Sequence, residues 1–216
     1  MFYKRFKNRE EAAEILAKEL LEYRGKKPVV LAVPRGGVVI AYEVAKVLDA
    51  PLDLIIPRKI GAPGNPELAI GAVTEDGTTI LNQRLIDELG ITKEYIEKEK
   101  INQIQEIKRR INVYLGDSLP QELVGKTVIL IDDGIATGAT IKAAICSIQK
   151  QKPAKIVVAT PVAPPETFNE LKREVDRIIC PVVYEPFFAI GQFYEDFSQV
   201  SDEEIMRLLK LSKSFQ

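Results

Sequence analysis

The chain has 216 residues, of which 46% are hydrophobic, and its 30 basic and 31 acidic residues give a formal net charge of -1. This size suits one α/β domain with a substantial core, and the balanced charge does not favour a polyanionic partner such as nucleic acid. Histidine is absent, which excludes catalytic triads, cysteine–histidine dyads and histidine-based zinc sites.

The remaining composition indicates a cytoplasmic protein. Cys146 and Cys180 lie far apart and outside any paired motif, which suits a reducing compartment. The charged first residues do not resemble a signal sequence, and no apolar run approaches the roughly 20 residues of a membrane span. We therefore expect a soluble protein without a membrane partner.

The first part of the chain alternates helices with short apolar strands. Asn8 and Glu11 form a capping-box pattern that predicts a helix running to about Tyr23. The pattern that follows predicts a strand at 28–33, a helix at 38–48 and a strand at 52–56.

The next segment is rich in Gly and Pro. The stretch from Arg58 to Pro66 predicts a long, mobile loop. After it, residues 70–73 and 78–81 are expected to form a hairpin around an Asp-Gly turn, followed by a short helix at 82–89.

The segment 92–115 is strongly charged but keeps an apolar stripe at steps of three and four. The stripe consists of Ile101, Ile104, Ile107, Ile111 and Tyr114. It predicts a long amphipathic helix whose apolar face is covered either by the chain's own domain or by a second copy in a homodimer.

The second half of the chain alternates strands and helices regularly. The expected strands lie at 127–131, 155–160 and 177–180, and the expected helices at 139–150, 165–173 and 202–211. This alternation predicts an α/β fold with a mostly parallel sheet and helices on both faces. We expect one domain over 1–216, with a core at about 28–181 and a small hood at about 182–200.

The most informative segment is Val128-Ile-Leu-Ile-Asp-Asp-Gly-Ile-Ala-Thr-Gly-Ala-Thr140. A buried strand places Asp132 and Asp133 at the carboxyl edge of the sheet, where open α/β folds bind ligands. Adjacent carboxylates there can accept hydrogen bonds from the vicinal diol of a ribose. The small side chains of the following loop let backbone N–H groups and a helix N-terminus surround a phosphate. The loop consists of Ala136, Thr137, Gly138, Ala139 and Thr140.

This segment resembles the motif with which type I phosphoribosyltransferases bind 5-phosphoribosyl-1-pyrophosphate (PRPP). The resemblance implies that Asp132 and Asp133 are catalytic acids that contact the ribose hydroxyls, and that the loop at 136–140 binds the ribose 5-phosphate. It also implies Mg²⁺ as the cofactor, held mainly by PRPP, with the same two acids as candidate protein ligands.

Two positions depart from the family pattern. Gly134 stands where the family usually has an aliphatic residue. Ala136 occupies the position of an aspartate that handles the purine ring proton in hypoxanthine-guanine enzymes, whereas adenine enzymes also have Ala-Thr-Gly here. The acceptor base therefore stays undecided.

Two further segments are expected to bind the pyrophosphate. Val33-Pro-Arg-Gly-Gly37 resembles the family's pyrophosphate loop, with Arg35 as a forked donor and with Gly36 and Gly37 allowing close approach. The stretch that begins with Arg58 and Lys59 resembles the family's mobile loop, which closes over PRPP and excludes water.

The segment from Tyr184 to Phe197 is dense in aromatic residues, and the resemblance implies a hood that covers the base. Phe187, Phe188 and Tyr194 are the candidate base-stacking rings. Aromatic clusters of this kind also serve as core packing.

The sequence thus predicts a magnesium-dependent enzyme that transfers the phosphoribosyl group of PRPP to a nitrogenous base, a purine or a pyrimidine, and releases pyrophosphate. The alternatives are a PRPP-binding regulatory protein without turnover and a metal-dependent phosphohydrolase or phosphoacceptor domain that uses the acid pair. A regulator that binds nucleic acid would need a basic face, but interleaved acids favour a solvated surface for the one that the sequence offers. That face consists of Lys98, Lys100, Lys108, Arg109 and Arg110.

Overall fold

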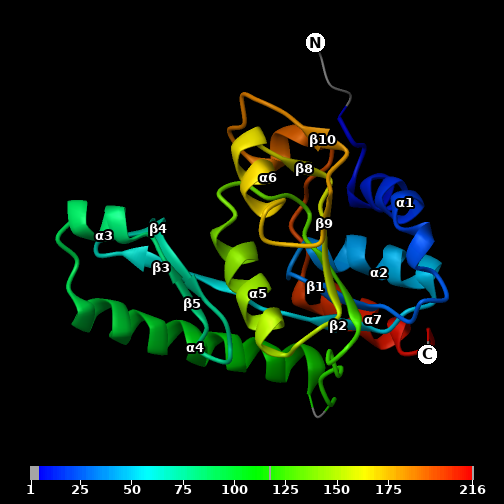
Figure 1. The fold of residues 1–216 in the computed structure, drawn as a ribbon, viewed down its shortest axis with the longest axis horizontal. Coiled ribbons are helices and arrows are strands. Elements are labelled where there is room, and N and C mark those ends of the chain that lie inside the picture. The colour runs from blue at the N-terminus through cyan, green and yellow to red at the C-terminus, as the bar shows by residue number, and fades with distance from the viewer. Residues whose placement is uncertain (1–4, 117, 216) are drawn as a thin grey trace.

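The computed structural model describes residues 5–116 and 118–215. At its centre lies a five-stranded sheet in the order β2-β1-β6-β7-β9 (Figure 1). All neighbouring strands in this sheet run parallel, which confirms the predicted fold class. The strands are β1 (Val29–Ala32), β2 (Leu52–Leu54), β6 (Thr127–Ile131), β7 (Lys155–Ala159) and β9 (Arg177–Ile179).

Alternate residues of the central strands belong to opposite faces of the sheet. Val30 and Ile129 lie in one hydrophobic core, whereas Leu31 and Leu130 lie in the other. All four are at most 4% exposed. Both faces are therefore buried, which explains why these strands are continuous apolar runs.

Helices cover both faces. One core packs against α1 (Arg9–Glu19), α2 (Gly37–Leu48) and α7 (Asp202–Ser212), and the other packs against α5 (Ala139–Lys150) and α6 (Pro165–Leu171). The predicted cap of α1 is present, because the Asn8 side chain accepts a hydrogen bond from the backbone N–H of Glu11. The 3-10 helix η1 (Leu21–Tyr23) then ends this segment near the predicted position.

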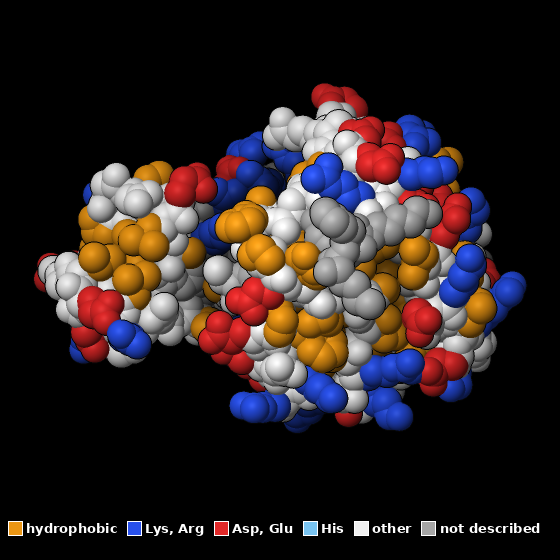
Figure 2. All heavy atoms as spheres, turned by 90° about the horizontal axis from the view of Figure 1, so that it is seen from above, with side chains coloured by type: hydrophobic (Ala, Val, Ile, Leu, Met, Phe, Trp, Pro, Cys, Tyr) orange, Lys and Arg blue, Asp and Glu red, His pale blue; other side chains and the backbone are white. Residues whose placement is uncertain are grey.

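A second group of elements extends from this body as an arm (Figure 1). Its three strands form an antiparallel sheet, and α4 runs along the arm and back to the body. Figure 2 shows the arm as a lobe joined to the body by a narrower neck, with Lys and Arg side chains gathered at the junction. The arm consists of β3 (Arg58–Ala62), β4 (Asn65–Val73), β5 (Thr79–Leu81), α3 (Gln83–Glu88) and α4 (Lys93–Leu115).

The prediction of a mobile loop at 58–66 was wrong, because this stretch forms β3 and the start of β4. Ile60 is fully buried in β3. Tyr95 of α4 donates a hydrogen bond from Oη to the carbonyl oxygen of Gly61 (3.0 Å), which ties the hairpin to the helix. Gly64 has a φ of +73° in the turn, so the glycine that suggested a loop instead closes a hairpin.

α4 is the long amphipathic helix that the sequence predicted. Ile96, Ile107 and Tyr114 are buried, and the helix packs against the arm strands and α7. Ile101, which the sequence placed in the apolar stripe, is 54% exposed. Towards the start of the helix Ile96 is buried instead. Within the described residues, neither this helix nor any other is long and apolar enough to cross a membrane.

The hood is built from two distant parts of the chain. β8 (Val162–Ala163) and β10 (Val182–Val183) form a small parallel pair, followed by the 3-10 helix η2 (Ile190–Phe193). Phe6 bridges to Tyr194, and the backbone N–H of Phe6 donates to the carbonyl oxygen of Phe193 (2.9 Å). The N-terminal segment therefore completes the hood, which no local sequence pattern indicated.

Candidate active site

The two predicted acids lie at the carboxyl end of β6, the middle strand of the sheet. Asp132 is partly buried, and Asp133 is 8% exposed. The backbone N–H of Asp133 donates to Oδ1 of Asp132 (2.9 Å). Asp132 therefore keeps the more accessible carboxylate of the two.

Asp133 forms a buried ion pair that the sequence analysis missed. Arg9, at the start of α1, donates from Nε to Oδ2 of Asp133 (2.8 Å), and the two side chains are 10% and 11% exposed. The same guanidinium donates to the carbonyl oxygen of Ser198 (2.8 Å) and lies 4.0 Å from the centroid of the Phe197 ring. The N-terminal helix and the segment after the hood thus hold Asp133 in one orientation.

The glycine loop at 34–37 approaches the acid pair closely. A side chain at Gly36 would overlap with the Asp133 carboxylate, and one at Gly37 would lie 2.9 Å from the carbonyl oxygen of Ile131. Glycine is therefore the residue that fits at both positions. The peptide bond between Pro34 and the next residue is cis. The structure brings this predicted loop and the predicted acids together at one edge of the sheet.

The negative charges of the acid pair lie in unfavourable surroundings. Burial raises the pKa of Asp132 well above its usual range, and the neighbouring negative charge of Asp133 raises it further. The pKa of Asp133 is also raised, because burial outweighs the attraction of Arg9. Hydroxyl donors or a cation placed at Asp132 would stabilise its ionised form.

The loop at 136–140 has the shape of an anion site. Gly138 has a φ of +74° and is the N-cap of α5. Thr167 of α6 donates from Oγ1 to the carbonyl oxygen of Ala136 (2.7 Å), which fixes the loop. Ala136 and Thr137 are exposed. Because the first N–H groups of a helix lack partners within it, the partly accessible start of α5 can bind a phosphate.

Gly134, where the resemblance implied an aliphatic residue, lies under the hood. A side chain at this position would overlap with Ile190 of η2 and would lie 3.0 Å from Val162 of β8. Ile190 therefore occupies the space that an aliphatic residue at 134 would fill. The hood and the acid loop pack as one unit.

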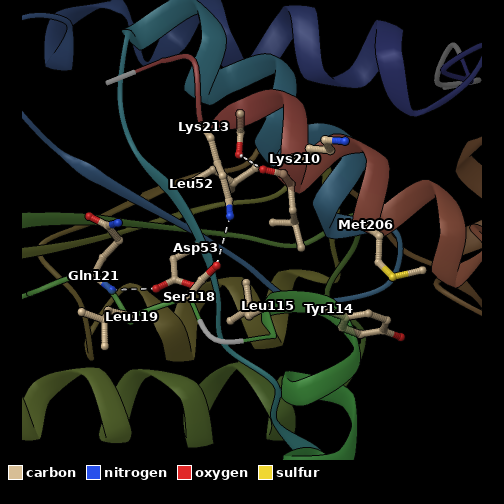
Figure 3. Close-up of a pocket in the computed structure, with 12 residues that line it drawn as sticks. Leu52, Asp53, Tyr114, Leu115, Ser118, Leu119, Gln121, Met206, Lys210 and Lys213 are labelled. Atoms are coloured by element: carbon tan, nitrogen blue, oxygen red, sulfur yellow. Dashed lines mark hydrogen bonds between the residues drawn. The ribbon is translucent and has the colours of Figure 1, made fainter.

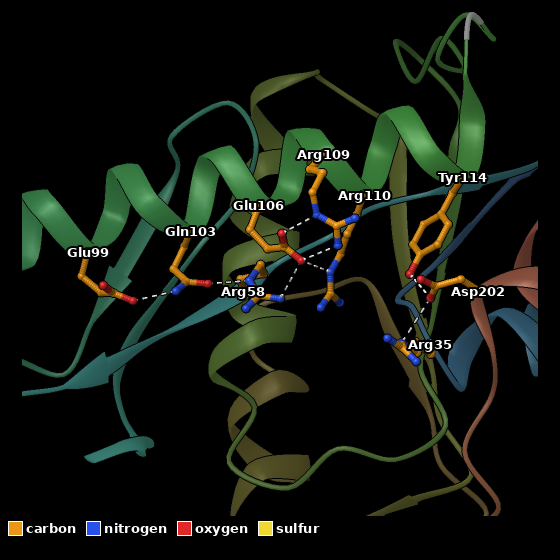
Figure 4. A network of polar contacts seen from close by, with 9 residues as sticks. All are labelled: Arg35, Arg58, Glu99, Gln103, Glu106, Arg109, Arg110, Tyr114 and Asp202. Carbon is orange, nitrogen blue, oxygen red and sulfur yellow. Dashed lines mark hydrogen bonds and ion pairs between the residues drawn. The ribbon is translucent and has the colours of Figure 1, made fainter. Parts of the chain in front are cut away.

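Arg35 contacts α7. Its Nε lies 3.5 Å from Oδ1 of Asp202, and its Nη1 donates to the carbonyl oxygen of Val200 (3.3 Å). Tyr114 of α4 donates from Oη to the same Asp202 oxygen (2.7 Å), as Figure 4 shows. Two helices thus fix this guanidinium, and its contact with pyrophosphate stays a prediction.

Arg58 begins β3 and contacts α4. Its Nε donates to Oε1 of Gln103 (2.5 Å). Together with Lys59 it lines a cavity of about 330 Å³. Pro34 and Thr140 also contribute to the wall, so the cavity adjoins the glycine loop, the arm and the loop at 136–140.

The three candidate base-stacking rings differ in exposure. Phe187 packs against Phe193 with ring centroids 4.9 Å apart, and Phe188 is 85% exposed. Tyr194 is 2% exposed and donates from Oη to the carbonyl oxygen of Asp133 (2.6 Å). The prediction for Tyr194 was wrong, because its buried ring has no free face for a base; it supports the acid pair instead.

A separate cavity of about 680 Å³ lies at the β2 edge of the sheet, between the end of α4 and α7 (Figure 3). Asp53 lines it and is 7% exposed, but its carboxylate accepts hydrogen bonds from the backbone N–H groups of Leu54 and Gln121 (2.8 Å each). The predicted site residues do not line this cavity. It is therefore separate from the candidate site.

Comparison with known proteins assigns the chain to a family. A family model described as "Phosphoribosyl transferase domain" matches residues 3–198. The chain belongs to the phosphoribosyltransferase family. The matched range includes the acid pair, the loop at 136–140, the arm and most of the hood.

Two relatives extend this result. A Mycobacterium tuberculosis protein named "Putative phosphoribosyl transferase" is 40% identical over 209 residues, which cover 95% of this chain and 46% of that protein. The chain therefore spans about half the length of that relative. The crystal structure of TT1426 from Thermus thermophilus has a TM-score of 0.80 and 39% identity, and the match covers 95% of this chain and 97% of the other.

Proposed function

We propose that this phosphoribosyltransferase transfers the 5-phosphoribosyl group of PRPP to a nitrogenous base and releases pyrophosphate. The observation that carries the proposal is the meeting of the acid pair, the loop at 136–140 and the glycines at 36 and 37 at one edge of the parallel sheet. These three parts offer acceptors for the ribose diol, N–H groups for the 5-phosphate and open backbone for the pyrophosphate.

In this reaction the chain positions the substrate and stabilises charge. Asp132 accepts hydrogen bonds from the ribose hydroxyls, while Arg9 holds Asp133 behind it. Positive charge develops on the ribose as the bond from C1 to pyrophosphate lengthens, and a nitrogen of the acceptor attacks C1. The acid pair stabilises that positive charge, and nearby cations stabilise the leaving group.

The donor set fits a magnesium ion held mainly by the substrate. Over the described ranges 5–116 and 118–215, no group of three acidic, histidine or cysteine residues could hold a metal by itself. Mg²⁺ is commonly bound by one or two carboxylates together with substrate oxygens and water. Asp132 is the more accessible of the two predicted carboxylate ligands. When bound, the ion would neutralise charge on the leaving pyrophosphate.

The acceptor in this proposal is a purine or pyrimidine base. Phe187 and Phe188 remain candidates for stacking on it, with Phe188 the exposed one. The resemblance does not choose between the two classes of base, because the position that handles the ring proton in some purine enzymes is Ala136 here.

Pyrophosphate release from Mg-PRPP, measured with and without a pooled set of nucleobases, tests the proposal. Release that depends on the pool would establish the transferase, and splitting the pool would identify the acceptor. PRPP binding without release at any acceptor would favour a regulatory protein. Phosphoryl hydrolysis without PRPP binding would favour the phosphohydrolase alternative.

A further inference from the structure

The cavity beside the glycine loop receives an arginine from α4. Glu99, Gln103, Glu106 and Arg110 follow one another at steps of four, three and four, so they form a polar stripe along one side of the helix (Figure 4). The cavity wall includes Arg110, Gln103 and Glu99 from this stripe, with Arg58, Lys59 and Thr140 from other elements.

Glu106 organises the guanidinium groups at this cavity. Its Oε1 accepts a hydrogen bond from Nε of Arg110 (2.8 Å) and lies 4.0 Å from Nη1 of Arg58. Within the described part of the chain, Arg110 donates hydrogen bonds through Nε alone. Both terminal nitrogens of Arg110 are therefore available to an anion.

The charge on the cavity wall favours an anion. Burial lowers the pKa of Arg58, and the positive charge of Arg110 lowers it further. Glu67 and Glu99 also line the wall, and Glu106 pairs with both arginines behind it. With Arg109, which pairs with the same Glu106, the four cations outnumber these three carboxylates. Glu99 accepts a hydrogen bond from Gln103 (2.6 Å). An anion in the cavity could accept charge-assisted hydrogen bonds from both arginines, in addition to the pairing that Glu106 gives them.

We propose that Arg110 binds the pyrophosphate of PRPP together with Arg58, through its two terminal nitrogens. The inference rests on the proposed function, which puts pyrophosphate beside the glycine loop. Thr140 belongs both to the cavity wall and to the phosphate loop, so one PRPP molecule can occupy both subsites. α4 thus supplies a substrate contact that the sequence motifs did not contain.

Calorimetric titration of the wild type, Arg110→Gln and Arg109→Gln with PRPP, inorganic pyrophosphate and ribose 5-phosphate, all with Mg²⁺, tests this inference. Arg109 is the matched control, because it donates to the same Glu106 carboxylate (2.7 and 2.9 Å) but is 59% exposed and does not line the cavity. Arg110→Gln should weaken PRPP and pyrophosphate binding by about 10- to 100-fold and leave ribose 5-phosphate within about twofold. Arg109→Gln should leave all three affinities unchanged.

Arg110→Lys is the second variant, and it keeps the charge but loses the forked donor. It should bind PRPP with intermediate affinity. Equal PRPP affinity in the wild type and Arg110→Gln would overturn the inference and leave the proposed function intact. An equal loss of ribose 5-phosphate affinity in Arg110→Gln would also overturn it, since the residue would then act on the whole fold. A wild type that binds no PRPP would contradict the proposed function itself.

Discussion

Asp132 and Asp133 follow each other in the chain, yet their surroundings differ. Asp133 is held between Arg9 and the glycine loop, whereas Asp132 accepts a backbone hydrogen bond and stays partly accessible. The raised pKa of both acids means that the fold disfavours their charges. Such unfavourable charge is typical of functional sites, where stability and activity oppose each other.

Asp132→Asn should separate activity from stability. Turnover should fall by roughly 100-fold or more, because the charge that stabilises the developing positive ribose is removed. The raised pKa of Asp132 means that the wild type loses stability as the pH rises above the ordinary value of 3.8 and through that raised pKa, and the variant lacks this loss. At about pH 8 the variant should melt above the wild type, by a margin that shrinks toward about pH 4. A lower melting temperature at the higher pH would contradict this reading of the site.

Arg9→Met should destabilise the protein by about 3–5 kcal/mol at neutral pH, because it leaves the buried Asp133 carboxylate without its cation. Arg9 lowers the pKa of Asp133, so its loss raises that pKa further, and the destabilisation should shrink on acidification as the carboxyl becomes protonated. Urea unfolding at two pH values measures both effects. Arg9→Met combined with Asp133→Asn is the control and should recover most of the loss; no recovery would show that the ion pair is not the cause.

The starts of several helices could be predicted from neighbouring residues, whereas the first strand of the arm could not. The side chains of Asn8, Thr92 and Ser201 accept N-cap hydrogen bonds that open α1, α4 and α7, and such caps depend on residues three positions apart. β3 was missed because the stretch from its end into β4, residues 61–66, is rich in glycine and proline. Its burial depends on α4, which begins about thirty residues later, so no local pattern could reveal it.

The packing of η2 on Gly134 can be tested by changing the size of the two residues in contact. Gly134→Ala should cost about 1–3 kcal/mol, because the new methyl group overlaps with Ile190. Ile190→Ala removes the overlapping atoms, so the double variant should be more stable than the sum of the two single effects implies. Thermal or urea unfolding of the four proteins in this cycle measures the coupling. If the two changes in unfolding free energy simply add, Ile190 of the hood does not pack against residue 134.

For the whole molecule, the sequence predicted the sheet and its two covering layers, because each strand and helix carries its own periodicity. It also singled out three segments that the structure brings together at one edge of the sheet, since each is one continuous motif. They are the acid pair, the loop at 136–140 and the glycine loop. It did not predict Arg9 beside Asp133, because 124 positions separate them. The polar residues on α4 recur at steps of three and four, which the sequence shows. The contact of this stripe with Arg58 is known only from the tertiary fold.

Arm and body together form the pyrophosphate side of the proposed site. The cavity wall combines Arg58 and Lys59 from the arm strands, Arg110 from α4, and Thr140 from the body. A β-hairpin, formed by β3 and β4, therefore borders this side of the cavity. The affinity for PRPP should therefore depend on residues of both the arm and the body.

Backbone hydrogen exchange with and without saturating Mg-PRPP tests whether the loop at 136–140 and the glycine loop bind PRPP. We predict slower exchange of the amides at 137–140 and at 36–37 when PRPP is present, because these N–H groups would be covered by the 5-phosphate and the pyrophosphate. The amides of α7 beyond its first turn serve as an internal reference and should not change. Unchanged exchange at 137–140 under saturating PRPP would contradict the assignment of this loop to the ribose 5-phosphate.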